Sequence, residues 1–377
     1  MKRRRIVFVQ TQAENAGAQE VSRLLGEQLT NRGHEVRHVF FYRKSEDFSA
    51  PPNTFIICDK RPSKAEIFSF LTGLYKFIKE FEPDCVFCFQ HFGNVLGAPV
   101  ARLAGCPVIV ANQVTAPSLI NPVLTALDKV FGVIGLYDSI TVNSNFLLDA
   151  YTQRPKRYVE KLTLIPQGFE TKKSDVDKAT ARLELGLPED VALLGCSARL
   201  NPAKQLDKVI AILPNKPDWH FAIAGQGPDY NRLMELAAKH GVTSQVHFLG
   251  EFSPDRIGVF LASLDVFVFP SAAESFGLAA IEAAQVGVPV VANSLPVLQE
   301  VLQANGAPCA LFADVSNTAE FSSAIETVLT DQDLANSLRD RSDDLKMRYS
   351  LDAMVDAYEN LAVGNDVSFS TNEALAS

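Results

Sequence analysis

The segment Val266–Ala284 reads VFVFPSAAESFGLAAIEAA, and it carries the clearest structural signal in the chain. Its first four residues form an apolar run that predicts a buried strand, which Pro270 ends. A short loop then carries Glu274, and an alanine-rich helix is expected to begin near Ser275, a suitable N-cap, and to close at Gly287. Strand, loop and helix in this order are typical of an α/β domain with a parallel sheet.

The same alternation of short apolar runs and helix-length segments continues in both directions. It predicts two doubly wound, Rossmann-like α/β domains whose sheets face each other across a cleft. The strands are expected at Ile6–Val9, Glu35–Phe41, Thr54–Cys58, Cys85–Phe89, Val108–Ala111 and Ile140–Val142, and then at Ala192–Ser197, His220–Ala224, Val246–Leu249, Val266–Phe269 and Val288–Ala292.

A segment rich in proline, glycine and polar residues, Ile165–Asp175, separates the two sets of strands and predicts a linker. We therefore expect an N-terminal domain over residues 1–170 and a C-terminal domain over residues 171–350. Residues 351–363 form an amphipathic pattern that predicts a helix returning to the N-terminal domain. Residues 364–377 are small and polar, and we expect a flexible tail there.

Composition excludes several classes of protein. The 377 residues are 47% hydrophobic and 21% charged, which excludes disordered and collagen-like chains. The longest apolar runs are far shorter than the roughly 18–20 residues that span a bilayer. Six scattered cysteines lie mostly in apolar runs, as reduced thiols do, and the basic N-terminus lacks a signal-peptide pattern. We expect a cytoplasmic protein.

Charge divides unevenly between the two halves. Residues 1–170 contain 20 lysines and arginines against 16 acidic residues, whereas residues 171–377 contain 15 against 28. This asymmetry either has no purpose or lets the basic half face an anionic acceptor or a membrane surface. Tyr75, Phe77 and Ile78 beside Lys76 and Lys79 leave room for weak peripheral membrane contact, although a core-facing helix explains such residues more often. We expect no nucleic-acid partner.

Charged residues cluster at the predicted strand ends of the second half. The backbone N–H groups from Phe276 to Ala279 open a helix and predict an anion site, while Glu282 is the only charge inside that helix. Arg199 follows another buried strand, and a turn returns Lys204 toward the same edge. Two cations and a helix N-terminus together suit a diphosphate without a divalent ion.

Three other patterns fail as functional motifs. Cys85 and Cys88 have the spacing of a redox or zinc pair, but on a strand they point to opposite faces. Gly225-Gln226-Gly227 lacks the remaining features of a dinucleotide-binding fingerprint. Asp175-Val176-Asp177 lies in the linker with no strand before it, which disfavours a divalent-metal site there.

Several of these segments resemble the retaining GT-B glycosyltransferases of family 4, also called glycosyl transferases group 1. The resemblance is specific over roughly residues 160–305 and looser before them. It rests on the Glu274–Glu282 segment, the pair of Arg199 and Lys204, Ala224–Pro228, Phe248–Gly250, Gly287–Ala292 and Ile165–Gly168.

This resemblance implies a nucleotide-diphosphate sugar donor, such as a UDP- or GDP-sugar, in the second half and an acceptor in the first. Glu274, Arg199 and Lys204 would be catalytic, and the leaving phosphate would help to deprotonate the acceptor hydroxyl. Donor-binding residues would be Glu282, Ser275, Phe276, Gly277, Leu278, Gly17, Gly250, Glu251 and Phe252, with Glu282 on the ribose.

The first half departs from the family in two places. A glycine pair is usual in the first loop, and here only Gly17 is present. The family usually places a histidine near the donor sugar where this chain has Gln113, which cannot carry a positive charge. His91 resembles a family histidine placed earlier in this half, although a structural role explains it equally. We expect His91 and Gln113 to lie near the acceptor or the sugar.

The sequence thus predicts a metal-independent, retaining hexosyltransferase of polysaccharide or glycoconjugate biosynthesis, with no cofactor and with an acceptor that stays unknown. Two alternatives remain open. One is another GT-B enzyme, such as a nucleotide-sugar 2-epimerase. The other is a non-catalytic binding protein that kept the fold.

Overall fold

The protein is described by a computed structural model over residues 2–14, 17–46, 48–63, 65–253 and 256–365. It divides into two compact units. The N-terminal unit contains the chain up to Phe169 together with the segment that begins at Tyr349, and the C-terminal unit runs from Glu170 to Arg348. The expected tail falls almost wholly in residues 366–377, which lie outside the described residues.

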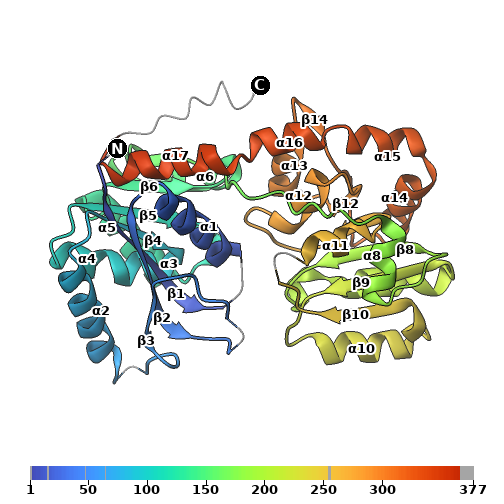
Figure 1. The fold of residues 1–377 in the computed structure, drawn as a ribbon, viewed down its shortest axis with the longest axis horizontal. Helices are drawn as coiled ribbons and strands as arrows, with labels where there is room; N and C mark the ends of the chain where they lie inside the picture. The colour runs from blue at the N-terminus through green and yellow to red at the C-terminus, as the bar shows by residue number, and fades with distance from the viewer. Residues whose placement is uncertain (1, 15–16, 47, 64, 254–255, 366–377) are drawn as a thin grey trace. The chain divides into compact units, whose positions relative to one another are not determined.

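The N-terminal unit is built on a seven-stranded parallel sheet in the order β3-β2-β1-β4-β5-β6-β7 (Figure 1). The strand order reverses between β1 and β4, and such a reversal is where open α/β sheets bind ligands. The strands are β1 (Arg5–Ala13), β2 (Glu35–Arg43), β3 (Thr54–Cys58), β4 (Cys85–Phe89), β5 (Val108–Gln113), β6 (Ser139–Val142) and β7 (Leu162–Leu164).

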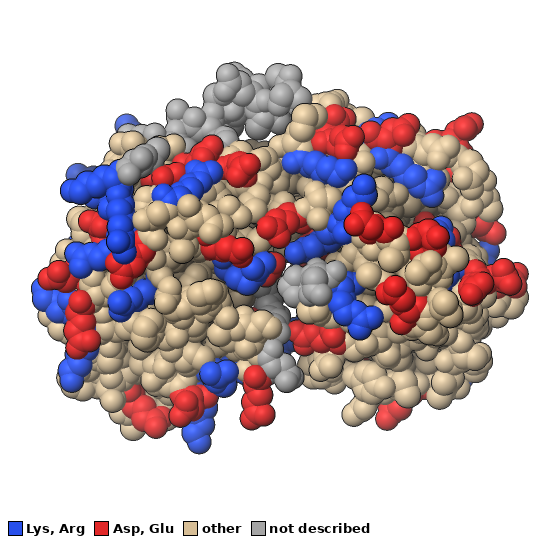
Figure 2. Space-filling model, viewed as in Figure 1, with Lys and Arg blue, Asp and Glu red and all other residues tan. Residues whose placement is uncertain are grey.

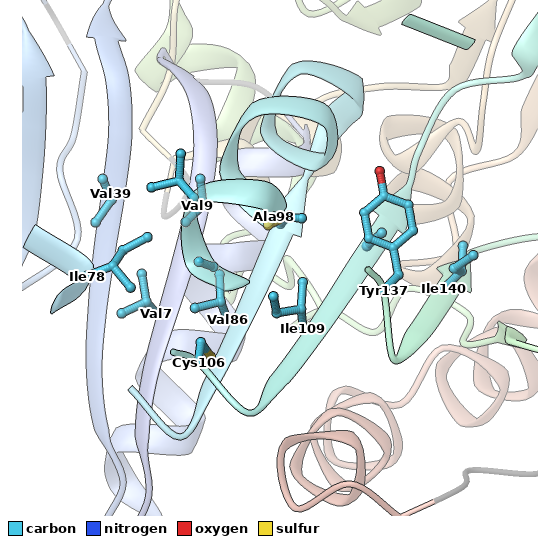
Figure 3. Close-up of a cluster of buried hydrophobic side chains, with 14 of the residues drawn as sticks. Val7, Val9, Val39, Ile78, Val86, Ala98, Cys106, Ile109, Tyr137 and Ile140 are labelled. Atoms are coloured by element: carbon cyan, nitrogen blue, oxygen red, sulfur yellow. The ribbon is translucent and has the colours of Figure 1, made fainter. Parts of the chain in front are cut away.

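Helices cover both faces of this sheet, as its apolar strands require. One face packs against α2 (Ile67–Phe81) and α4 (Ala98–Leu103), and Figure 3 shows part of the resulting cluster. The other face packs against α1 (Gly17–Asn31) and α17 (Leu351–Ala362). Cys85 and Cys88 are both buried and belong to different clusters, which confirms that they point to opposite faces. The remaining helices are α3 (Gln90–Phe92), α5 (Pro122–Ile134), α6 (Asn145–Thr152) and α7 (Lys156–Val159).

The helix α17 is held in the N-terminal unit by buried polar contacts as well as by apolar packing. The Tyr358 hydroxyl donates to Asn112 Oδ1 at 2.7 Å, and Glu359 Oε1 lies 2.9 Å from His34 Nε2. This helix lies where the sequence predicts an amphipathic one, and its Met354, Tyr358 and Leu361 are all buried.

The helix α2 carries the aromatic residues that the sequence places beside Lys76 and Lys79. Ile78 is buried in the core, and Tyr75 and Phe77 are partly buried against it. These three side chains pack on the core, whereas Phe68 of the same helix is 79% exposed, so membrane contact stays a prediction.

The C-terminal unit repeats the design with a six-stranded parallel sheet in the order β10-β9-β8-β11-β12-β15. Here the order reverses between β8 and β11. The elements of the sheet are β8 (Ala192–Ser197), β9 (Trp219–Ala224), β10 (Val246–Gly250), β11 (Val266–Phe269), β12 (Val290–Asn293) and β15 (Leu311–Ala313), with a small pair β13 (Gln303–Ala304) and β14 (Ala307–Pro308) beside it. The predicted fold class of two parallel α/β domains is confirmed.

The helices of this unit include the one that follows β11. They are α8 (Lys178–Leu185), α9 (Leu206–Ile212), α10 (Tyr230–Lys239), α11 (Ile257–Ala262), α12 (Leu278–Gln285), α13 (Pro296–Val301), α14 (Thr318–Thr330), α15 (Gln332–Arg339) and α16 (Ser342–Arg348). The sequence suggested Ser275 as the N-cap of α12, and this prediction is wrong. Gly277 takes that position with φ of 88°, a left-handed conformation that glycine adopts without strain.

Candidate functional site

The loops that follow β8 and β11 form the candidate site of the C-terminal unit. Both loops leave the carboxyl ends of neighbouring strands at the point where the strand order reverses. The short helix η3 (Pro202–Lys204) closes the first loop, and the backbone N–H of Ala272 in the second donates to the Ala203 carbonyl at 2.8 Å. This bond ties the two loops together, so residues 69 positions apart in sequence meet here.

Lys204 and Glu274 form an ion pair at the junction of these loops. Lys204 Nζ donates to Glu274 Oε1 at 2.5 Å, and the two side chains are 22% and 12% exposed. Lys204 Nζ also lies 5.3 Å from the centroid of the Phe269 ring. Because both groups are held in place and largely shielded from water, their charges act on a ligand with less screening than surface charges do.

Cys196, the fifth residue of β8, is buried, and this changes the pKa of its thiol. Loss of solvent raises the pKa of its thiol to about 12, with smaller opposing effects of Lys204, which lowers the pKa, and Glu274, which raises it. Cys196 is therefore a neutral thiol beneath the ion pair and not a nucleophile.

The helix α12 follows the loop after β11, with Gly277 as its N-cap. A Cβ on Gly277 would come within 2.5 Å of Leu298 Cδ2, so the position needs glycine for space as well as for conformation. Phe276 is buried, and Ser275 and Leu278 are partly buried. The first N–H groups of any helix have no acceptor inside it and can point to an anion. Glu282, partly buried, is the only charged residue of α12.

Arg199 and the segment after β10 contain the other residues of the C-terminal unit that were predicted to bind the donor. Arg199 is exposed at the end of β8, next to the loop that carries Lys204. Gly250 ends β10 with φ of 77°, Glu251 is exposed, and the Phe252 ring packs on Phe260 with centroids 6.0 Å apart.

The two glycines after β9 have a packing role. A Cβ on Gly225 would lie 1.9 Å from the Ala198 carbonyl oxygen, and one on Gly227 would lie 2.2 Å from that of Leu200. The Leu200 N–H donates to the Gln226 carbonyl at 2.9 Å, and the Gly225 N–H donates to the Gly250 carbonyl at 2.6 Å. Glycine is thus needed for the loops after β8, β9 and β10 to run in contact.

The corresponding reversal in the N-terminal unit lies between β1 and β4. Gly17 opens α1 after β1, and His91 lies in α3 directly after β4. Gln90, the first residue of α3, has φ of 65°. This conformation is uncommon for a residue with a side chain and is often found at functional sites. Burial lowers the pKa of His91, and its Nδ1 is buried without a hydrogen-bond partner among the described residues. A neutral imidazole with a spare acceptor or donor suits a hydroxyl ligand.

Gln113, at the end of β5, is buried in a polar network. Its Nε2 donates to Asp128 Oδ1 at 2.7 Å and lies 3.1 Å from the Tyr158 hydroxyl, and its Oε1 accepts from the Tyr151 hydroxyl at 3.0 Å. Tyr158 also donates to Asp128 Oδ2 at 2.8 Å. Burial raises the pKa of Asp128, although these donors oppose the effect. Both ends of the amide are therefore engaged, and the contact of Gln113 with a sugar stays a prediction.

Sequence reasoning missed a group of neutral amides at the strand ends of the N-terminal unit. Gln10 Oε1 in β1, Asn94 Oδ1 after β4 and both polar side-chain atoms of Asn143 after β6 are buried without partners among the described residues. Buried amides normally satisfy these atoms, so a water or another polar group is the expected partner of each. The signal that could have found them is a polar residue within or directly after a buried strand.

Neither surface charge nor a group of three or more metal ligands indicates a further site in the described part of the chain. Figure 2 shows acidic and basic side chains interspersed over the visible face, with uncharged residues between them. Among the described residues there is no group of three or more histidine, cysteine or acidic side chains placed to hold a metal ion. No helix of the described part of the chain is long and apolar enough to cross a bilayer.

Two family models match the chain, one on each unit. The model for glycosyl transferases group 1 matches residues 177–344, and the model for glycosyltransferase family 4 matches residues 16–173. Between them the two matches cover most of the chain.

Curated relatives are similar over part of their length. The lipopolysaccharide core biosynthesis mannosyltransferase LpsB of Rhizobium meliloti is 30% identical over 215 residues, 53% of this chain and 61% of the relative. The O-antigen biosynthesis glycosyltransferase WclY of Escherichia coli is 32% identical over 124 residues, 33% of this chain and 35% of the relative. The matched regions thus span about three-fifths and about one-third of these relatives.

Solved structures match the fold over nearly the whole chain. Anabaena HepE in complex with UDP and glucose has a TM-score of 0.81 at 18% identity, covering 95% of this chain and 98% of that one. WaaG, a glycosyltransferase involved in lipopolysaccharide biosynthesis, has a TM-score of 0.75 at 16% identity, covering 96% and 100%. Family models on both units and the shared architecture agree: the chain belongs to the group 1 glycosyltransferases of the GT-B fold.

Proposed function

We propose that the protein is a retaining, metal-independent hexosyltransferase that moves a sugar from a nucleotide-diphosphate sugar to an acceptor hydroxyl. One observation carries the proposal: Lys204 and Glu274 form a shielded ion pair where β8 and β11 diverge, beside the start of α12. A diphosphate fits this combination of a fixed cation and helix N–H groups. An acidic group beside the cation fits the sugar hydroxyls.

In this proposal the C-terminal unit holds the donor. Lys204 and Arg199 bind the diphosphate, and the N–H groups of Gly277 and Leu278 meet its oxygens. Glu282 accepts hydrogen bonds from the ribose hydroxyls, and the segment Gly250–Phe252 borders the base. When a ligand enters, one Glu274 oxygen keeps its contact with Lys204 while the other accepts from a sugar hydroxyl, since a carboxylate has room for several donors.

Catalysis then follows from the charge that develops on the leaving group. As the bond between the sugar carbon and the phosphate oxygen breaks, negative charge grows on the diphosphate. Lys204 is already positioned there and stabilises that charge without reorganisation. The leaving phosphate oxygen takes the proton of the acceptor hydroxyl, which attacks from the same side of the sugar, and configuration is retained.

The N-terminal unit binds the acceptor in this proposal. Its strand ends present a neutral histidine, His91, and the unpartnered amide atoms of Gln10, Asn94 and Asn143. Neutral donors and acceptors suit the hydroxyls of a sugar or a glycolipid headgroup. The relatives LpsB and WclY, named for lipopolysaccharide core and O-antigen biosynthesis, support glycoconjugate acceptors of this kind.

The test is release of nucleoside diphosphate from UDP-, GDP- and ADP-sugars by the purified chain with EDTA present, followed by mass spectrometry. UDP-sugars are tried first because UDP and glucose are named with the HepE structure. We expect slow hydrolysis of one donor. Glu274→Gln should abolish hydrolysis, and Glu282→Gln should weaken nucleotide binding by about tenfold, the loss of hydrogen bonds to a charged group.

Matched controls and the other outcomes separate the alternatives. Glu235→Gln, on the exposed side of α10, should leave both measurements unchanged. Release that needs EDTA to be absent would overturn metal independence, and release of free epimerised sugar would favour the 2-epimerase. No binding of any nucleotide in a thermal-shift assay would favour the non-catalytic binding protein.

A further inference from the structure

Two histidines of the C-terminal unit meet on one face of its sheet. The strands β9 and β10 run parallel, and His247 on β10 lies opposite Ala222, two residues after His220 on β9. Because side chains two positions apart on a strand share a face, both imidazoles project from the same side. His220 Nδ1 lies 2.9 Å from His247 Nε2, and the two ring planes differ by 15°.

This histidine pair lies away from the candidate donor site and within reach of solvent. Each histidine is the second residue of its strand, so the pair is near the amino ends of the strands. The loops of the candidate site instead leave the carboxyl ends. The strand β10 is at the edge of the sheet, and both histidines are only partly buried. An ion can therefore reach the pair from water without entering the donor site.

The chemistry of the pair suits a transition metal. Neutral imidazole is a ligand for Zn²⁺, Cu²⁺ and Ni²⁺. Burial lowers the pKa of both rings, and His220 lowers the pKa of His247 further, so both rings are uncharged at neutral pH.

The distance between the two nitrogens is also suitable. With metal–nitrogen bonds of about 2.0–2.1 Å, two ligand nitrogens lie about 2.9 Å apart at neighbouring corners of a square-planar ion and about 3.3 Å apart on a tetrahedral one. The observed separation of 2.9 Å equals the first value and needs a small opening to reach the second. Among the described residues no third histidine, cysteine or acidic side chain joins the pair as a metal ligand.

We propose that His220 Nδ1 and His247 Nε2 together bind a divalent transition-metal ion, with water in its remaining coordination positions. In the structure one ring donates its N–H to the other. For both nitrogens to become ligands, that proton moves through solvent to the other nitrogen of its own ring, and the rings turn until their lone pairs converge. The bound ion then bridges the edge strand β10 to β9. The inference does not depend on the proposed transfer reaction, and a metal at this place is compatible with transfer in EDTA.

The experiment is calorimetric titration of the full chain with Zn²⁺, Cu²⁺ and Mg²⁺ at neutral pH. We expect Cu²⁺ to bind more tightly than Zn²⁺, and Mg²⁺ not to bind, because a hard cation prefers oxygen ligands. Bound Cu²⁺ should show nitrogen ligands in its electron paramagnetic resonance spectrum. Zn²⁺ should raise the melting temperature of the chain, and its affinity should fall as pH falls, because protons compete for the same nitrogens.

Substitutions locate the site. His220→Gln and His247→Gln should each weaken Zn²⁺ binding by about tenfold or more. The matched control is His240→Gln, an exposed histidine directly after α10, which should bind Zn²⁺ like the parent.

Three results would overturn the proposal: binding by the parent no tighter than by His220→Gln/His247→Gln, an equal loss in His240→Gln, or displacement of Zn²⁺ by equimolar Mg²⁺. The first of these would show that the pair is only a hydrogen bond between strands. Melting curves without metal check that each variant is folded. If one single variant unfolds, the other and the Cu²⁺ spectrum of the parent still test the site.

Discussion

The strand ends of the two units carry different chemistry although the units share one topology. In the C-terminal unit the reversal between β8 and β11 brings Lys204 onto Glu274 at 2.5 Å. In the N-terminal unit the reversal between β1 and β4 carries His91, whose pKa burial lowers, near neutral amides such as Asn94. The same backbone plan thus carries a shielded ion pair in one unit and neutral polar side chains in the other.

The largest expected effect tests the charged side of this comparison. Lys204→Ala should cost about 2–4 kcal/mol of transition-state stabilisation, a drop of roughly 30- to 1,000-fold in turnover, because a positioned donor to the leaving group is lost. Steady-state kinetics of the donor found above would measure it. Lys239→Ala, an exposed lysine on α10, should turn over like the parent.

The ion pair adds a sharper version of this test. Because Lys204 and Glu274 contact each other, the double alanine variant should lose less than the sum of the two single losses. Additive losses in the double-mutant cycle would mean that the two residues act independently, and would contradict a shared site.

The neutral side of the comparison should respond to acid. His38 on β2 is buried against Phe8, and burial lowers its pKa to about 4. The unfolded chain binds this proton near the ordinary pKa of about 6.5, so the stabilising contribution is complete above that pH. It is lost as pH falls from about 6.5 to about 4 and amounts to about 3 kcal/mol.

Urea unfolding at several pH values would measure this loss, and His38→Phe should remove most of it. The half-buried pair His220 and His247 in the C-terminal unit, with Nδ1 of the first 2.9 Å from Nε2 of the second, also has lowered pKa values. Its double variant His220→Gln/His247→Gln should remove less of the pH dependence. The reverse ranking would locate the acid sensitivity in the C-terminal unit.

Gln113 tests whether the neutral network is structural, catalytic or both. Gln113→Met removes three hydrogen bonds and leaves Asp128 and Tyr158 with fewer partners, so unfolding free energy should fall by about 1–3 kcal/mol. Nucleotide affinity should stay unchanged, because both ends of the Gln113 amide are engaged inside the N-terminal unit. Unchanged stability would contradict the network, and a loss of kcat at full stability would support the predicted contact with the sugar.

The sequence predicted the strands best where four or more mostly apolar residues follow one another. The predicted bounds of β3, β4, β8 and β11 match those of the structure. The edge strands β7 and β15 were missed because each has only three residues, which is too few to show a strand pattern, and each gains its hydrogen bonds from one neighbour. Edge pairing depends on tertiary position, which a local pattern does not contain.

The site residues, like the strands, could be predicted from the sequence only where the signal was local. Glu274 and Lys204 were found because motifs and strand ends are local signals. Their ion pair and the network of Gln113 each depend on contacts between segments far apart in sequence, and so they were not predictable. The Ser275 cap was wrong for a related reason, since Leu298 packs where only Gly277 leaves room.

The smallest expected effect comes from comparing the start of α12 with a capped helix of the N-terminal unit. In the N-terminal unit Ser144 caps α6, its Oγ accepting from the Leu147 N–H at 3.2 Å, whereas α12 begins at Gly277 without a side-chain cap. Ser144→Ala should therefore cost about 1 kcal/mol of unfolding free energy, and Ser275→Ala less than about 0.5 kcal/mol. A helix whose first N–H groups are not used by its own cap keeps them for a ligand, so nucleotide should protect the C-terminal unit in hydrogen exchange at Gly277 and Leu278. Equal costs for the two serines, or no protection by nucleotide, would show that the start of α12 is an ordinary capped helix and would remove it from the donor site.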